Sequence, residues 1–231
     1  LTELRAADLC FTVDETTQFF NRIMNLKLSG HDISVLESRT EGWIAGLQLA
    51  GLSMQGREDI PSFIKTFAGD DRHVVDYLAE EVLNVQSEQI QNFLLQTSIL
   101  NRLSAPLCDF VTHNKGSQEI LYELESANLF IVPLDNKRYW YRYHHLFAEL
   151  LQQRLHQTQS DLVAELHNRA SKWCRQNGLE DEAVNHALAT QDFEQVALLI
   201  VEQADTIWER GEHAKFKRWL EKLPADLVFS R

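Results

Sequence analysis

The spacing of hydrophobic residues predicts helices along most of the chain. Four prolines and nine glycines in 231 residues leave long segments in which apolar residues recur every three or four positions. The first part of the chain is therefore expected to form a helical bundle. Its predicted elements are a short strand at residues 3–9 and helices starting at residue 12, at 32–39, at 41–54, from residue 60, and at 70–85.

Two local patterns sharpen this prediction. Thr12 and Glu15 fit the capping box of a helix start. Small residues run through the segment 41–54, which lets another backbone approach closely, so this helix is expected at the buried centre of the bundle. The helix that begins at the Thr12 cap is expected to have one apolar face. That face is defined by residues at helical spacing: Phe19, Phe20, Ile23 and Met24.

Residues 87–158 show a different order of predicted elements, typical of a winged helix. Helices are predicted at 88–100, at 104–113 with Ser104 as the N-cap, and at 117–127 with Ser117 as the N-cap. Strands at 129–134 and 139–143 follow, joined by a tight turn at 135–138, and a last helix covers 145–156. Three helices followed by a hairpin form the winged-helix variant of the helix-turn-helix.

The remaining residues, 159–231, form paired helices at 162–176, 180–190, 193–210 and 214–223. Trp173 and Gly178 recur loosely as Trp208 and Gly211, a period close to that of tetratricopeptide hairpins. The predicted fold is thus mainly α: a helical bundle at 1–86, a winged helix at 87–158, and tetratricopeptide-like hairpins at 159–231.

Composition and charge narrow the function classes. An apolar share of 44% and a charged share of 24% are ordinary for a soluble globular protein, and no apolar run approaches membrane-spanning length. Three widely spaced cysteines suggest reduced structural thiols in the cytoplasm. The net charge of −12 disfavours non-specific nucleic-acid binding. The first and last residues lead us to expect a piece of a longer protein.

The strand-to-helix junction at residues 140–147 carries the candidate chemistry. Two adjacent histidines, His144 and His145, stand at the start of a helix, where unpaired N–H groups and the helix dipole attract anions such as phosphate. The alternative is that His144 only caps or packs at this corner. Arg142 could equally pair with a neighbouring acid or stabilise a nucleotide. No spacing of His, Cys or acids predicts a metal site.

DNA binding and catalysis have less support. The predicted recognition helix at 117–127 carries Glu119, Glu123 and Glu125 and no basic residue, so phosphates would repel it. Lys137, Arg138 and Arg142 on the wing suffice for a contact but not for an interface. No catalytic set can be assigned, and acids such as those at 180–182 suggest solvated helix faces or caps.

Five ordered blocks resemble a known family. Residues 40–50, TEGWIAGLQLA, resemble the TEGW-x-x-GL-x-LA signature of the large ATP-binding LuxR-type transcriptional regulators, which belong to the STAND class of signal-transducing ATPases. Residues 94–100, 107–109, 128–130 and 140–147 are similar to further blocks of that family in the same order. The resemblance extends over essentially the whole chain. It further implies that residues 1–86 hold the end of a nucleotide domain with a helical domain, and residues 159–231 the start of a superhelical domain.

The resemblance implies roles for particular residues. His144 matches the histidine of a Met-His-Asp motif that contacts the β-phosphate of ADP, with His145 in place of the Asp. Residues 46–50 resemble a GLPLA motif near the adenine, which assigns Gly46 and Gln48 to that side, with Gln48 in place of the proline. Arg142 is the second candidate for a phosphate contact. No phosphate loop or magnesium site is present in the chain, so ATP or ADP with magnesium is expected on a P-loop domain elsewhere in the parent protein.

The leading hypothesis is a regulatory module, not an enzyme in itself, of an ATP-dependent transcriptional activator. It would close over ADP in the inactive state. A small-molecule or protein inducer would bind the repeat domain, self-association would follow activation, and DNA would be bound only by a separate C-terminal helix-turn-helix. The alternative is a helical protein-interaction scaffold without nucleotide coupling.

Overall fold

The computed structural model describes residues 10–57, 59–67, 72–127 and 129–224, which are mainly helical, with one antiparallel hairpin. The chain divides into two compact units. One contains the residues up to 104 together with 118–157, and the other contains 105–117 together with the residues from 158 onward. The predicted strand at 3–9 and the start of the predicted helix at 70–85 lie outside the described residues.

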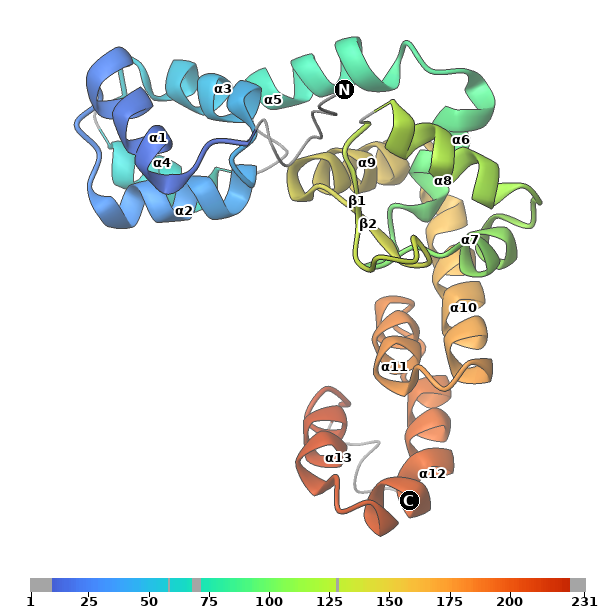
Figure 1. The fold of residues 1–231 in the computed structure, drawn as a ribbon. Helices are drawn as coiled ribbons and strands as arrows, with labels where there is room; N and C mark the ends of the chain where they lie inside the picture. The colour runs from blue at the N-terminus through green and yellow to red at the C-terminus, as the bar shows by residue number, and fades with distance from the viewer. Residues whose placement is uncertain (1–9, 58, 68–71, 128, 225–231) are drawn as a thin grey trace. The chain divides into compact units, whose positions relative to one another are not determined.

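Helices joined by short turns make up the beginning of the first unit (Figure 1). Its core includes Phe20, Ile33, Leu36, Leu47 and Met54, all of which are fully buried. Two of the helical segments are π-helical and carry the labels η2 and η3. The elements are α1 (Val13–Gln18), η2 (Phe19–Ile23), α2 (Gly30–Thr40), α3 (Ile44–Met54), α4 (Ile60–Thr66), α5 (Arg72–Tyr77) and η3 (Leu78–Leu83).

The start of the first helix is confirmed, but its apolar face is not. The Thr12 hydroxyl accepts from the backbone N–H of Glu15, and the Glu15 carboxylate accepts from that of Thr12, so the capping box is present. Ile23, however, is 73% exposed while Phe20 is buried. Because the chain is π-helical from Phe19 to Ile23, each turn takes more residues, and a spacing of three no longer returns to the same face.

Helix α3 differs from its prediction in two ways. It begins at Ile44 rather than at 41, because the chain turns at residues 41–42 with positive φ. Its small residues also receive side chains and not a second backbone: a Cβ on Gly46 would lie 2.4 Å from the Trp43 ring, and one on Gly51 would lie 2.6 Å from Met24. Helix α3 is therefore buried on one face only, with Ile44 and its opposite face exposed.

The winged-helix part of the first unit carries the hairpin. Strands β1 (Ile131–Pro133) and β2 (Tyr141–Tyr143) pair antiparallel, with Ile131 opposite Tyr143 and Pro133 opposite Tyr141. In the turn between them, the Asp135 carboxylate accepts three backbone N–H groups, which fixes its shape. The helices of this part are α6 (Glu88–Thr97), α8 (Ser117–Ser126) and α9 (His145–Thr158).

One predicted helix end in this region was wrong, and one predicted cap hydrogen bond is not formed. Helix α6 ends at Thr97, three residues early, because the chain leaves the helix to bring Leu103 beside Tyr141 in an isolated bridge. Ser104 was expected to cap the next helix, α7 (Ala105–Thr112), but its buried hydroxyl makes no hydrogen bond with the described residues. Ser117 is the first residue of α8, and its N–H donates to Asp109.

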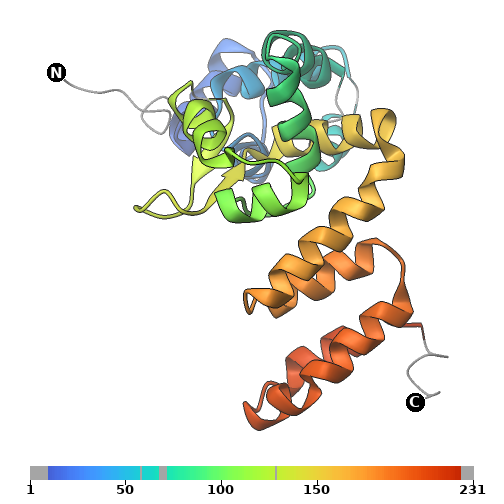
Figure 2. The same cartoon turned by 90° about the vertical axis from the view of Figure 1, so that its right-hand side faces the viewer.

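The second unit contains α7 and the C-terminal helices. Helices α10 (Ser160–Gln176) and α12 (Phe193–Glu209) are both 17 residues long and begin 33 positions apart. Each is followed by a glycine with positive φ, Gly178 or Gly211, and then by a shorter helix, α11 (Glu180–Ala189) or α13 (His213–Leu220). Each pair forms a hairpin (Figures 1 and 2). The predicted helical hairpins are thus confirmed, and their period is 33 residues.

Acidic residues at the start of α11 join the two hairpins. Glu180 lies 3.0 Å from the Lys215 ammonium, and Asp181 accepts from Arg218 at 2.9 Å and from the Trp219 indole at 3.0 Å. Trp219 is buried. The acids at 180–182 were expected to form a solvated face or cap; Glu180 and Asp181, in the first turn of α11, additionally bind α13.

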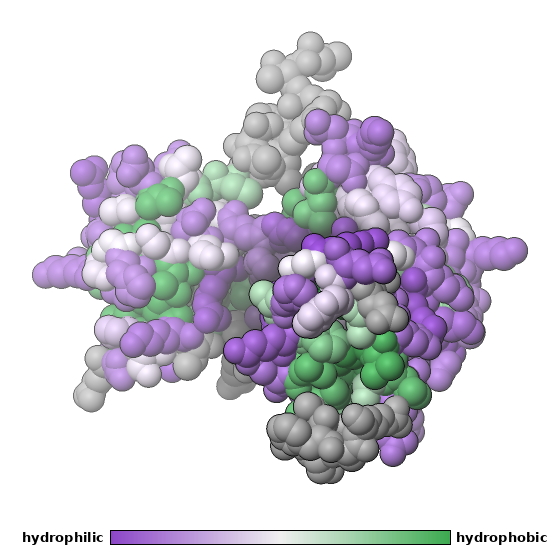
Figure 3. Space-filling model, turned by 90° about the horizontal axis from the view of Figure 1, so that it is seen from below, coloured by the Kyte–Doolittle hydropathy of each residue, from purple (hydrophilic) through white to green (hydrophobic). Residues whose placement is uncertain are grey.

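The two tryptophans that suggested the repeat are not equivalent. Trp173 is buried in α10, whereas Trp208 is 68% exposed and lies against His213 with 4.4 Å between ring centroids. Hydrophobic side chains reach the surface of this unit (Figure 3). The glycines rather than the tryptophans therefore mark the repeat.

Three further findings concern the cysteines, membrane-length helices and metal-type clusters. No disulfide joins the three cysteines. In the part of the chain that the structure describes, no helix combines the length and the apolar character that crossing a membrane requires. The same residues contain no group of three or more His, Cys, Asp or Glu side chains arranged to hold a metal ion.

Candidate functional site

The site is built on a tight chain reversal between α2 and α3. Glu41 ends α2 with φ of 51° and Gly42 follows with φ of 71°. The N–H of Trp43 donates to the carbonyl of Thr40 at 2.8 Å, and the N–H of Phe11 donates to the carbonyl of Gly42 at 2.8 Å. A Cβ on Gly42 would lie 2.5 Å from the Phe11 carbonyl oxygen, so only glycine fits. The turn fixes the position from which the Glu41 side chain extends.

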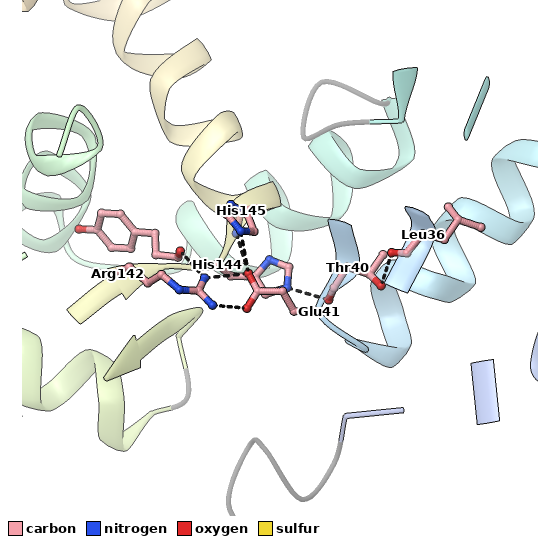
Figure 4. Close-up of polar contacts among 7 residues, drawn as sticks. Leu36, Thr40, Glu41, Arg142, His144 and His145 are labelled. Atoms are coloured by element: carbon pink, nitrogen blue, oxygen red, sulfur yellow. Dashed lines mark hydrogen bonds and ion pairs between the residues drawn. The ribbon is translucent and has the colours of Figure 1, made fainter. Parts of the chain in front are cut away.

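Glu41 and Arg142 form a two-pronged ion pair within the first unit (Figure 4). Arg142 Nη1 donates to Glu41 Oε1 at 2.8 Å, and Nη2 donates to Oε2 at 2.6 Å. The side chains are 27% and 22% exposed, so solvent screens them only in part. Such bidentate pairs are the strong class of ion pair. Of the two roles considered for Arg142, the structure shows the pairing with a neighbouring acid.

The same carboxylate lies at the start of α9. The backbone N–H of His145, the first residue of α9, donates to Glu41 Oε1 at 3.4 Å, and the His145 ring nitrogen Nε2 is 3.7 Å from that oxygen. A negative charge here is favoured by the helix dipole. Burial acts to raise the pKa of Glu41, but the hydrogen bonds and charge of Arg142 and the backbone hydrogen bond from His145 oppose it, and the pKa of Glu41 lies below the ordinary value.

His144 makes the second link to the turn. Its ring nitrogen Nε2 lies 2.8 Å from the Thr40 carbonyl oxygen and therefore donates to it, while its own backbone N–H donates to the Phe130 carbonyl. The side chain is 7% exposed, and Nδ1 is buried without a hydrogen bond to the described residues. Burial lowers the pKa of His144, against the opposing effect of Glu41. The neutral ring is thus favoured, with Nδ1 able only to accept.

Aromatic rings close the junction around this histidine. Trp43 lies edge-on to Phe130 with 4.7 Å between centroids, and both rings lie 5.9 Å from the His144 ring. Tyr77 contacts Trp43 from the other side at 5.8 Å. Trp43 also fills the space over Gly46, so it is a packing residue of this junction.

The four residues singled out in the sequence do not all meet. Arg142 and His144 lie together, and Gly46 is buried beneath Trp43, whose ring packs against His144. Gln48 is exposed on α3, one turn after Ile44, which is also exposed. The proposed adenine side and the proposed phosphate side are thus carried by separate faces of the same region.

Sequence reasoning missed the acceptors of the site, Thr40 and Glu41. The signal was present in Gly42, because a glycine after a periodic segment ends a helix with a left-handed turn. Reading residues 41–54 as one helix placed Glu41 inside a helix and hid its role. The partner Arg142 is 101 positions away along the chain, a separation that no local pattern reveals.

The wing offers few basic groups for nucleic acid. Arg138 pairs with Glu125 at 2.9 Å, and Arg142 pairs with Glu41. Glu119 and Glu123 are exposed on α8. The helix that would read DNA therefore presents acids, and two of the three basic wing residues are already paired, which agrees with a protein-contact role for the winged helix.

The sequence of this chain is similar to those of known proteins. Residues 79–163 match the MalT winged helix domain family. The whole chain is 32% identical over 231 residues to the serine/threonine-protein kinase PknK of Mycobacterium tuberculosis, covering 21% of that protein. It is 33% identical over 230 residues to the HTH-type transcriptional regulator MalT of Yersinia enterocolitica, covering 99% of this chain and 26% of that protein.

The resemblance to MalT-like regulators is thereby confirmed, and residues 79–163 are similar to the MalT winged helix domain family. The chain spans about a quarter or less of the length of these curated relatives. The boundaries predicted at residues 86 and 158 stay a prediction.

Proposed function

We propose that this MalT-like chain is a regulatory module in which the Glu41–Arg142–His144 junction couples the helical part to the winged helix according to the nucleotide state of a larger protein. The observation that carries the proposal is the junction itself. The Glu41–Arg142 ion pair spans 101 positions of the chain, and the hydrogen bond from His144 to Thr40 spans 104. A change at this junction therefore affects both the helical part and the winged helix.

The two kinds of relative support a module rather than an output domain. One relative is named as a protein kinase and the other as a transcriptional regulator, and the similarity to this chain extends over its whole length in each case. A segment shared by a protein kinase and a transcriptional regulator is suited to regulating such activities and not to carrying them out. We therefore assign no catalysis to the segment and place DNA binding, where the parent has it, in another domain.

The residues of the junction fit a phosphate group. Arg142 and the first N–H of α9 already bind a carboxylate, which carries the same type of acceptor oxygen. When bound to a P-loop domain of the parent, ADP or ATP with magnesium would supply the phosphate. His144 and Arg142 would face it, and Gly46 and Gln48 of α3 would lie on the adenine side. For His144 to donate to a phosphate, its ring must release the Thr40 carbonyl or take up a proton at Nδ1.

The repeat hairpins and the parent supply the remaining parts of the proposal. The hairpins of the second unit would receive a small-molecule or protein inducer, and activation would lead to self-association. The expected compartment is the cytoplasm. The rival function is a helical scaffold that binds a partner protein without responding to nucleotide.

The test is ADP retention by the full-length protein that carries this chain. We expect His144→Ala and Arg142→Gln to lower ADP retention and to raise basal output, because each removes a group that would face the phosphate. Arg138→Gln is the matched control: it removes another wing arginine that pairs with a glutamate, Glu125, away from the junction. Equal ADP retention in all variants and the unaltered protein would favour the scaffold.

A further inference from the structure

Glu41 occupies the groups that an incoming phosphate would need. Both of its oxygens bind the two terminal nitrogens of Arg142, and Oε1 also accepts the first N–H of α9. The His145 ring lies 3.7 Å from the same oxygen (Figure 4). A guanidinium that is engaged bidentately by one anion cannot present the same pair of N–H groups to a second anion.

We propose that the Glu41 carboxylate is a built-in competitor of phosphate at this junction, which rests on the proposed nucleotide-coupled function. Glu41 holds Arg142 and the start of α9 while no phosphate is there, and it must withdraw when a phosphate binds. Arg142 then serves either the α2–α3 turn or the phosphate. This exchange converts phosphate binding into the loss of the Glu41 ion pair between the helical part and the winged helix, while the His144 hydrogen bond and the Trp43 ring contacts are separate from it.

The geometry allows such an exchange. The pair is partly open to solvent, with Arg142 27% and Glu41 22% exposed, so neither charge is sealed in the interior. Glu41 and Gly42 are both left-handed at the end of α2, and this turn is held by backbone hydrogen bonds of neighbouring residues rather than by the Glu41 side chain. The His144 bond to the Thr40 carbonyl uses none of the carboxylate's atoms, so the junction keeps this link when Glu41 leaves and His144 donates to the phosphate from a protonated Nδ1.

Charge also favours exchange over sharing. A carboxylate and a phosphate around one guanidinium repel each other, and the repulsion is strong where solvent is limited. Removing the negative charge of Glu41 should therefore free Arg142 and strengthen phosphate binding. A Glu41 that merely supported Arg142 in position would have the opposite effect, because its removal would leave Arg142 disordered and weaken binding.

The experiment measures ADP affinity of the full-length protein by calorimetry. Glu41→Gln keeps the size of the side chain and removes its charge, and we expect ADP to bind about tenfold more tightly. Glu37→Gln, one turn earlier on α2, changes the net charge equally without touching Arg142 and should leave the affinity unchanged. Glu41→Asp retains the charge on a shorter side chain and should give an intermediate affinity. Circular dichroism checks that each variant is folded.

Two outcomes overturn the competitor role in distinguishable ways. If Arg142→Gln and His144→Ala weaken ADP binding but Glu41→Gln leaves it unchanged or weaker, Glu41 is only a support, and the nucleotide-coupled function stands without this mechanism. If none of the four substitutions at positions 41, 142 and 144 changes ADP affinity, the proposed function fails together with it.

Discussion

At the scale of single residues, Gly42 decides whether the turn that carries Glu41 can form. Its φ of 71° disfavours any residue with a Cβ, and that Cβ would lie 2.5 Å from a backbone oxygen of Phe11 that cannot move independently. We expect Gly42→Ala to lower the free energy of unfolding by about 3 kcal/mol, from the left-handed backbone and the clash together. Urea unfolding measures this value.

Gly56 provides the matched control. It has a similar φ of 78°, but a Cβ there meets nothing within 4 Å, so Gly56→Ala should cost only about 1 kcal/mol. Equal losses at the two positions would mean that the close approach of Phe11 to Gly42 contributes nothing to stability.

At the residue scale, the sequence predicted some members of the site and not others. Arg142 and His144 could be selected because histidine at a helix start and arginine beside it are rare and chemically specific. Glu41 could not be selected from the same reasoning, because a glutamate beside a periodic segment is usually a solvated helix residue. Only the fold brings it to Arg142, and the turn residue Gly42 was the sole local sign of it.

At the scale of elements, a buried polar contact ties the hairpin to α6. The Tyr143 hydroxyl of β2 and the Thr97 hydroxyl at the end of α6 lie 2.6 Å apart, and the Thr97 hydroxyl also donates to the Phe93 carbonyl. Since Thr97 donates to Phe93, the Tyr143 hydroxyl is the donor between them. Both side chains are buried, so the bond orients β2 on the helix without competition from water.

Tyr143→Phe should lower the free energy of unfolding by about 1 kcal/mol, because the Thr97 hydroxyl loses its donor but keeps its own acceptor. Tyr139→Phe, on the same hairpin but half exposed, should change stability by less than about 0.5 kcal/mol. Thermal unfolding of the two variants distinguishes the positions. A Tyr143→Phe variant as stable as Tyr139→Phe would show that packing alone holds β2.

Hydrophobic spacing predicted which elements exist better than it predicted where they end. The helices of the winged helix and of the hairpins follow from periodicity, since each buries one face. Their ends follow from other forces: α6 stops where Leu103 must reach Tyr141, and α3 starts late because Gly42 turns the chain. The exposure of Ile23 also follows from a feature that hydrophobic spacing does not reveal, because a π-helical turn changes the number of residues per helical turn.

At the scale of the whole molecule, α7 lies within the residues that match the winged helix family but packs in the second unit. It lies within the matched residues 79–163, yet it contacts α10, where the guanidinium of Arg169 donates to the Val111 carbonyl at 2.9 Å. Helix α10 in turn packs against α11. The stability of α7 should therefore follow that of the repeat hairpin and not that of α6.

A histidine pair makes this dependence testable by pH. His186 of α11 and His167 of α10 are hydrogen-bonded through their Nδ1 atoms at 3.0 Å, and burial, with the charge of His167, lowers the pKa of His186 to about 4. An unfolded chain has a histidine pKa of about 6.5. Because the folded pKa is the lower one, the stabilisation is complete above pH 6.5 and is lost as the pH falls from there towards 4, by up to about 3 kcal/mol.

Hydrogen exchange at pH 7 and pH 5, corrected for the intrinsic rate at each pH, follows both effects at once. On acidification, protection should fall in α10 and α11 and equally in α7, while α6 keeps its protection to a larger extent. His186→Gln cannot take up a proton and should remove the difference, whereas His213→Gln, at the exposed start of α13, should leave it. If α7 kept its protection together with α6 while α10 lost it, α7 would belong energetically to the winged helix, and its contact with α10 would be incidental to its stability.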